Sequence, residues 1–113
     1  MFTIEKPKQI KWPVTVSIPR DGGSAAKAVF TAHFRIIPGN EFNAIYQNGG
    51  NDEDLLRNVV VGFGNDVLDE SGTPLVFSQE SLDHLIGIPY VRNALVSAYL
   101  DLSQGKKAAT KNL

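Results

Sequence analysis

Residues Lys11–Ile37, KWPVTVSIPRDGGSAAKAVFTAHFRII, hold two segments in which apolar residues recur at every second position. This alternation places one apolar row on one face of a β-sheet. The two rows are Trp12, Val14, Val16 and Ile18, then Ala28, Phe30, Ala32, Phe34 and Ile36. Between them, Arg20–Ser24 contains Asp-Gly and Gly-Gly, which tolerate the positive φ angles of tight turns. The sequence therefore predicts an antiparallel β-hairpin over residues 11–37.

Two prolines, Pro13 and Pro19, lie in the first of these strands. Proline has no backbone N–H to donate to a sheet, so we expect at least one side of this strand to face solvent. A free edge of this kind can accept an added strand from a partner. Residues 1–10 lead into the strand as an arm with a short apolar patch of Phe2 and Ile4.

After Asn40 the apolar spacing changes to that of helices. The pattern predicts a short helix over about Glu41–Gln47 and a second helix capped by Asn51. The apolar stripe of the second helix is Leu55, Leu56, Val59 and Val60. Val59–Phe63 is rich in β-branched residues, so an end of this helix and a short buried strand both remain open.

The remaining chain predicts an ordered loop and two more helices. We expect Val67, Leu68, Leu75 and Val76 to pin the loop over residues 64–77. Ser78 is placed to cap a short helix, and Pro89 to begin the longest one. The apolar stripe of that last helix is Val91, Leu95, Ala98, Tyr99 and Leu102.

These elements together predict one α+β domain over residues 1–103, in which an N-terminal antiparallel β-hairpin (about 11–37) packs on a small bundle of about four helices (about 40–103). Residues 104–113 are expected to form a flexible polar tail. A chain of 113 residues with 42% apolar residues is long enough to bury one core without metals or disulfides.

Composition excludes several function classes. Eleven basic residues against 12 acidic ones give a net charge of −1, which disfavours nucleic acid as a partner. The absence of cysteine excludes disulfides and fits a reducing cytoplasm. No segment has the apolar length of a membrane span or a signal peptide, so we expect no membrane partner.

No pattern in the sequence announces catalytic chemistry. His33 and His84 lack partners at metal-ligand spacing, and Ser78 and Ser81 near His84 have a simpler explanation as a helix start. We therefore expect no catalytic site, no metal and no cofactor. Trp12, the single tryptophan, either anchors the hairpin on the helices or is exposed for a partner, and packing inward is favoured.

An ordered set of segments spanning most of the chain resembles the tail assembly chaperones of long-tailed bacteriophages. No single segment is specific on its own. The segments are Trp12–Pro19, Asp21–Gly23, Phe30–Arg35, Val60–Phe63, Asp69–Pro74, Phe77–Ser78 and Pro89–Leu95.

The resemblance implies a non-enzymatic protein of the host cell cytoplasm that is absent from the mature virion. Proteins of this family hold the tape measure protein in solution until tail tube subunits polymerise around it. The resemblance also implies the tail tube protein and a longer, frameshifted form of the chain, extended after about Gly105, as further partners. Stacking of several copies along the partner remains open.

No contact residue can be transferred from the family. Our own candidates for a partner-binding surface, or for the core beneath it, are Trp12, Phe34, Tyr90 and Tyr99. The rival hypothesis is a structural virion protein of the tail or the head-tail junction, which would be expected to have more strands than one hairpin.

Overall fold

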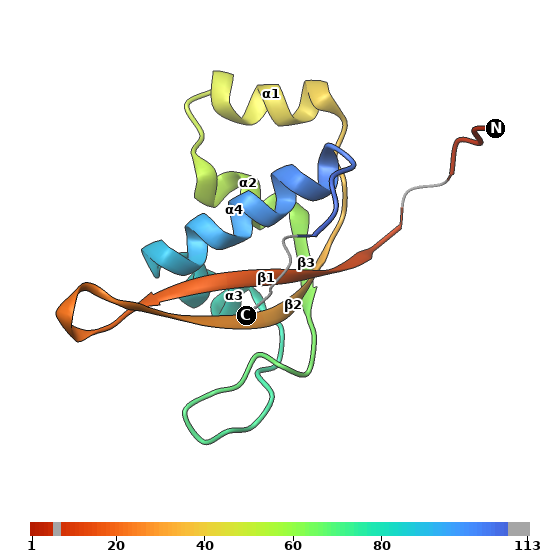
Figure 1. Cartoon of the computed structure of the whole chain (residues 1–113). Helices are drawn as coiled ribbons and strands as arrows, with labels where there is room; N and C mark the ends of the chain where they lie inside the picture. The colour runs from red at the N-terminus through yellow and green to blue at the C-terminus, as the bar shows by residue number, and fades with distance from the viewer. Residues whose placement is uncertain (6–7, 109–113) are drawn as a thin grey trace.

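The computed structural model describes residues 1–5 and 8–108 of the chain. It contains strands and helices in one mixed α+β fold (Figure 1). In chain order these are β1 (Ile10–Pro19), a 3₁₀ turn (Asp21–Gly23), β2 (Ala25–Phe34), α1 (Gly39–Gln47), α2 (Asp52–Val59), β3 (Val60–Phe63), α3 (Gln79–Ile86) and α4 (Pro89–Ser103). The predicted fold class, a hairpin packed on about four helices, is confirmed.

The hairpin has an unbroken antiparallel register from Ile10 opposite Phe34 to Pro19 opposite Ala25. Its turn lies where the sequence predicts it, and both central glycines have positive φ angles, 85° at Gly22 and 87° at Gly23. The second strand ends at Phe34, three residues before the predicted end, because β1 begins at Ile10 and offers no partner beyond it.

A third strand, β3, resolves the open choice at Val59–Phe63. Helix α2 ends at Val59, and Val60 begins a strand that pairs antiparallel with the end of β2. The sheet order is β1-β2-β3, with a register shift between His33 and Phe34. Burial alternates along β3 as in a strand, but the segment is a short, mostly apolar run, and such runs leave helix and strand both open from the sequence.

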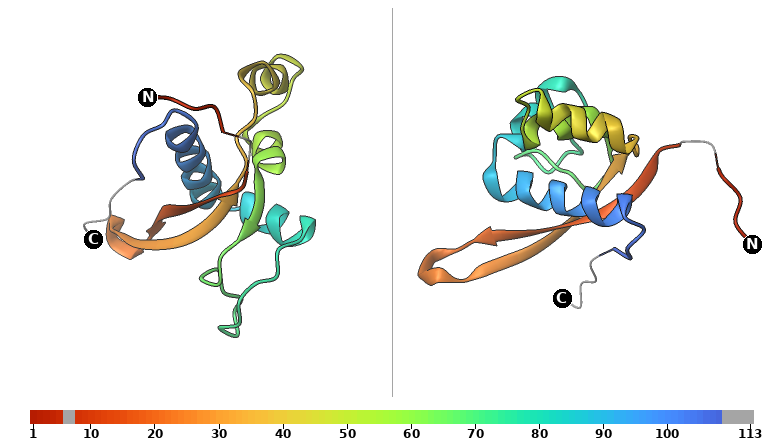
Figure 2. Two further views of the ribbon diagram at one scale, coloured as in Figure 1. Left: turned by 90° about the vertical axis from the view of Figure 1, so that its right-hand side faces the viewer. Right: turned by 90° about the horizontal axis from the view of Figure 1, so that it is seen from above.

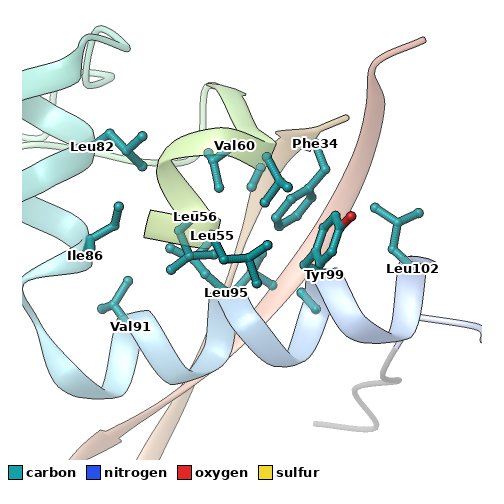
Figure 3. Packing of buried hydrophobic residues seen from close by; sticks show 14 of the residues in the cluster. Phe34, Leu55, Leu56, Val60, Leu82, Ile86, Val91, Leu95, Tyr99 and Leu102 are labelled. Carbon is teal, nitrogen blue, oxygen red and sulfur yellow. The ribbon is translucent and has the colours of Figure 1, made fainter. Parts of the chain in front are cut away.

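The core lies between the sheet and helices α2, α3 and α4 (Figure 3). Helix α4 packs against β1, and every residue of its predicted apolar stripe is buried. The predicted stripe of α2 is also buried. These stripes face the apolar row of the hairpin, in which Val14, Ala32 and Phe34 have no exposed surface. The hydrophobic periodicity therefore identified the residues that hold the layers together.

Local signals place the helix ends as predicted. The side chain of Asn51 accepts a hydrogen bond from the Asp54 N–H at 3.1 Å, and Asp54 accepts one from the Asn51 N–H at 3.0 Å, which completes a capping box. Ser78 and Ser81 form the equivalent box at α3. Pro89 occupies the first turn of α4, where its missing N–H costs no helical hydrogen bond.

The loop over residues 64–77 is held by polar contacts more than by the predicted apolar ones. Val67 is buried, but Leu68 and Val76 are 55% and 80% exposed, so the prediction that these two pin the loop is wrong. The loop folds back on itself through a bridge between Leu68 and Pro74, which carries it away from the core. Asp69 then secures its tip by accepting hydrogen bonds from backbone N–H groups of the turn.

Residues 109–113 of the predicted tail lie outside the described residues. The part just after α4 has a defined helix end. Gly105 has a φ of 75°, and the Lys106 N–H donates to the Asp101 carbonyl at 2.9 Å, as in a Schellman cap. Gly105 thus has a structural role, because a side chain is strained at this φ.

Candidate functional site

An apolar groove of about 260 Å³ lies beneath the hairpin. We call it the docking groove. The hairpin, the loop after β3, the end of α3 and the start of α4 all contribute to it. Its lining residues are Val16, Ile18, Ala28, Val29, Phe30, Asp66, Val67, Leu68, Leu85, Tyr90 and Val91.

The groove exists because the hairpin is longer than the helical layer that covers it. The hairpin turn lies well beyond the start of α4, both in Figure 1 and in the view from above in Figure 2. Val16 is buried, whereas Ile18, two residues nearer the turn, is only partly buried, as is Phe30 opposite Val14. Apolar side chains of the hairpin therefore continue past the edge of the core.

Hydrogen bonds show which way the backbone of β2 faces. The Arg20 N–H donates to the Ser24 carbonyl at 2.9 Å, so even-numbered residues of the hairpin pair across β1 and β2. Odd-numbered residues of β2 must then face the β3 side. Thr31 agrees, because its carbonyl accepts from the Gly64 N–H at 2.8 Å and its N–H donates to the Asp66 carboxylate at 2.9 Å.

Strand β2 continues past the end of β3 with an open edge. β3 pairs with β2 only at Ala32–Phe34, and Asp66 occupies the edge at Thr31. Beyond Thr31, within the described residues, no strand or side chain hydrogen-bonds the backbone of Lys27 or Val29 on this side. Val29 also lines the docking groove. An unpaired strand edge and an apolar groove thus lie next to each other.

The outer edge of β1 is less suited to accept a strand. The same alternation places Pro13 and Pro19 with their nitrogens on the outer side, where neither can donate. Helix α4 also lies close to this edge, since Pro13 and Thr15 line a small cavity of about 40 Å³ together with residues of α4. The predicted edge position of β1 is confirmed, but the accessible edge of the hairpin belongs to β2.

The predicted partner-binding residues separate into two groups. Phe34 and Tyr99 are 0% and 1% exposed, with ring centroids 6.0 Å apart in the core (Figure 3). Of the two roles proposed for them, a partner-binding surface or the core beneath it, both residues therefore belong to the core. Trp12 is half-buried, packs on the core cluster and lines the small cavity beside α4. Only Tyr90, 37% exposed, lies in the docking groove.

Apart from Tyr90, none of the eleven groove residues was among the predicted partner-binding residues; those missed include Ile18, Val29 and Leu68. A signal existed for Val29, because it is the one β-branched aliphatic residue in a row that otherwise carries Lys27, Thr31 and His33. A single apolar residue on the polar face of a strand is common, however, and does not by itself mark a contact surface. No signal distinguished Leu68 from a loop residue that packs inward.

A second hollow, of about 420 Å³, is polar and is explained by the fold. It is lined by Tyr46, Asn51–Glu53 and Arg92, together with Gly50. The Tyr46 hydroxyl donates to Asp52 at 2.7 Å, and burial, together with this carboxylate, raises the pKa of Tyr46 to about 12. Arg92 approaches Glu53 at 3.8 Å. These polar groups pair with one another, and their contacts connect α1, α2 and α4.

An ion-pair cluster centred on Arg57 joins α2 to α3. Its guanidinium lies 2.9 Å from Asp83, 3.4 Å from Glu53 and 3.5 Å from Asp54. The hydrogen bond from Arg57 lowers the pKa of the Asp83 carboxyl below its ordinary value, and that carboxylate in turn raises the pKa of Arg57. All four side chains are partly exposed, which makes the cluster a surface contact between helices.

The described residues hold neither a metal site nor a helix that could cross a membrane. Among residues 1–5 and 8–108, no three His, Cys, Asp or Glu side chains come together as a metal site. None of the helices in the same ranges combines the length and apolar character that a membrane crossing requires. His33 lies instead across the sheet from Gly62, with its ring over the glycine.

Comparison with known proteins gives no match to a family model, to a curated sequence or to a solved structure.

Proposed function

We propose that this chain is a non-enzymatic tail assembly chaperone of a long-tailed bacteriophage. In this proposal it binds the tape measure protein in the host cytoplasm, keeps it soluble until tail tube subunits polymerise around it, and is absent from the mature virion. The proposal rests on the resemblance of the ordered segments from Trp12 to Leu95.

The single structural observation in its support is the docking groove beside the open edge of β2. A long partner with exposed apolar surface needs a cover that can be removed again. The groove offers apolar contact to Ile18, Leu68 and Tyr90, and the edge offers backbone hydrogen bonds at Lys27 and Val29. Contacts of this small extent are weak one by one, so polymerising tube subunits can displace them.

The test is co-expression of the chain with the tape measure protein of its own phage, followed by affinity capture and measurement of the soluble tape measure fraction. The wild-type chain is expected to raise that fraction and to co-purify. Leu68→Asp should abolish both effects, because it places a charge in the apolar groove. Val76→Asp is the matched control, since Val76 is also exposed but does not line the groove.

Two results count against the proposal. If no complex forms and the tape measure protein stays insoluble, the chaperone function is wrong for this form of the chain. If the chain is found in purified particles, the rival function as a structural virion protein is favoured. β3 adds one strand, Val60–Phe63, to the hairpin, as the rival expects, and the helices after β2 are what argue against that rival.

A further inference from the structure

The segment before β1 carries exposed apolar residues. Phe2 and Ile4 are 86% and 85% exposed, and they alternate with Thr3 and Glu5 in the pattern of a strand with one apolar face. Exposed side chains of this size, two residues apart, cost free energy in water unless a surface covers them. Residues 1–5 therefore have the chemistry of a short strand that lacks a sheet.

We infer that the open edge of β2 and the docking groove bind residues 1–5 of a second copy of this chain as an added strand. The backbone N–H and C=O groups of Lys27 and Val29 supply the hydrogen bonds of the new pair. Phe2 and Ile4 then enter the groove over Ile18, Leu68 and Tyr90. Strand addition of this kind takes its affinity from the main chain and its specificity from alternate side chains.

Charge agrees with this pairing. Lys27 is the single charged residue of the open β2 edge, and Glu5 is the single charged side chain of residues 1–5. Among the described residues Glu5 pairs with Lys8, at 3.6 Å and with both side chains more than 70% exposed, a pair that contributes little. Glu5 can therefore exchange Lys8 for Lys27 with little loss.

A second copy is required because the chain's own residues cannot reach. Ile10 lies opposite Phe34, so Val29 is about 17 Å further along the sheet, toward the turn. The described chain directly before Ile10 continues β1 in the opposite direction, away from the turn (Figure 1). Six peptide steps from Ile4 to Ile10 span at most about 22 Å, and a reversal consumes at least about two of them.

Each copy carries both the segment and its groove, and the two lie at different places on the molecule. The contact is therefore heterologous, and it generates open chains or closed rings in place of a symmetric dimer. This inference goes beyond the proposed function, since it concerns self-assembly and holds without a tape measure protein. A partner segment that takes the same groove would compete with residues 1–5.

The test uses cysteines, because the chain has none of its own. A copy with Phe2→Cys and an affinity tag is mixed with an untagged copy that carries Leu68→Cys, under mild oxidation. The mixed disulfide is expected to form several times faster than with Asn43→Cys, an exposed position on α1 away from the groove. Equal rates with Leu68→Cys and Asn43→Cys would overturn the inference.

Two further measurements test whether the contact joins two copies and whether it depends on Phe2 and Ile4. A chain that carries both Phe2→Cys and Leu68→Cys should cross-link between copies; a bond formed only within one chain at high dilution overturns the assignment to a second copy. In sedimentation, the mean mass of the wild type should rise with concentration, and Phe2→Ser with Ile4→Ser should remain monomeric. Val76→Ser, the control, should behave as wild type, and a monomeric wild type refutes the inference.

Discussion

The hydroxyl oxygen of Tyr99 accepts a hydrogen bond from the backbone N–H of Ile37 at 3.2 Å, in the buried interior. Tyr99 lies on α4, and Ile37 lies where the chain leaves the sheet to enter α1. The Tyr99 ring also stacks on Phe42 of α1, with centroids 6.5 Å apart. One side chain therefore sets the exit of the sheet and the position of the next helix.

Tyr99→Phe tests this relationship. The substitution keeps the ring but leaves the Ile37 N–H without its acceptor, which should lower the free energy of unfolding by about 1–3 kcal/mol. Urea denaturation measures the change. Tyr90→Phe is the control, because the Tyr90 hydroxyl makes no hydrogen bond within the described residues, and it should stay within about 0.5 kcal/mol of wild type. Equal losses in the two variants would contradict the role of the buried bond.

Amide hydrogen exchange should alternate along β2. After correction for intrinsic rates, the amides of Ala28 and Phe30 should exchange slowly, because they donate to β1, and those of Lys27 and Val29 quickly, because they face the open edge. NMR exchange spectra of the free chain at low concentration measure this directly. A Val29 amide as protected as that of Phe30 would show that the edge is already occupied.

The ion pair between Arg57 and Asp83 predicts a pH dependence of stability. Arg57 lowers the folded-state pKa of Asp83, so the contribution is fully present above the ordinary carboxyl pKa and is lost as the pH falls through the lowered one. When the pH is lowered, the free energy of unfolding should therefore fall less in the Asp83→Asn variant than in the wild type, as measured by urea midpoints. Asp21→Asn, in the exposed turn, should retain the wild-type slope. Identical slopes in all three proteins would exclude the pair as a source.

A pair of glycines tests the helix-to-helix turn before α2. A Cβ on Gly50 would collide with the carbonyl oxygen of Ile45, so Gly50→Ala should destabilise the fold by at least about 1 kcal/mol. A Cβ on Gly39, at the start of α1, meets open space, and Gly39→Ala should be neutral or stabilise by up to about 1 kcal/mol. Thermal unfolding compares the two, and a tolerated Gly50→Ala would mean that the turn can shift.

The sequence predicted those parts of the fold that depend on local chemistry. Residues close together in the sequence determine the hairpin, the caps at Asn51 and Ser78, and the helix start at Pro89. The junction at Val59–Val60 could not be settled in this way, because both residues are β-branched and apolar, which suits a buried helix end as well as a buried strand. Only the pairing of Val60 with Phe34, far away in the chain, decides for the strand.

The docking groove could not be predicted, because it depends on how far the hairpin outreaches α4. That relation compares two elements more than 60 residues apart. Large aromatic residues were natural candidates for a surface, yet Phe34 and Tyr99 pack inward, since the same rings also fill the core best. Smaller residues such as Val29 and Leu68 are exposed by the arrangement of their neighbours.

Pro13 and Pro19 make the sheet one-sided. Their nitrogens interrupt the donors along the outer margin of β1, while β2 keeps its open backbone groups at Lys27 and Val29. A strand can add at β2, whereas the opposite margin is a poorer template, because two of its backbone donors are missing. Sheet growth that adds strands at both margins builds fibres, whereas the prolines of β1 hinder addition at one of the two margins here. A protein can in this way expose an unpaired strand edge at high concentration and still resist amyloid-like growth.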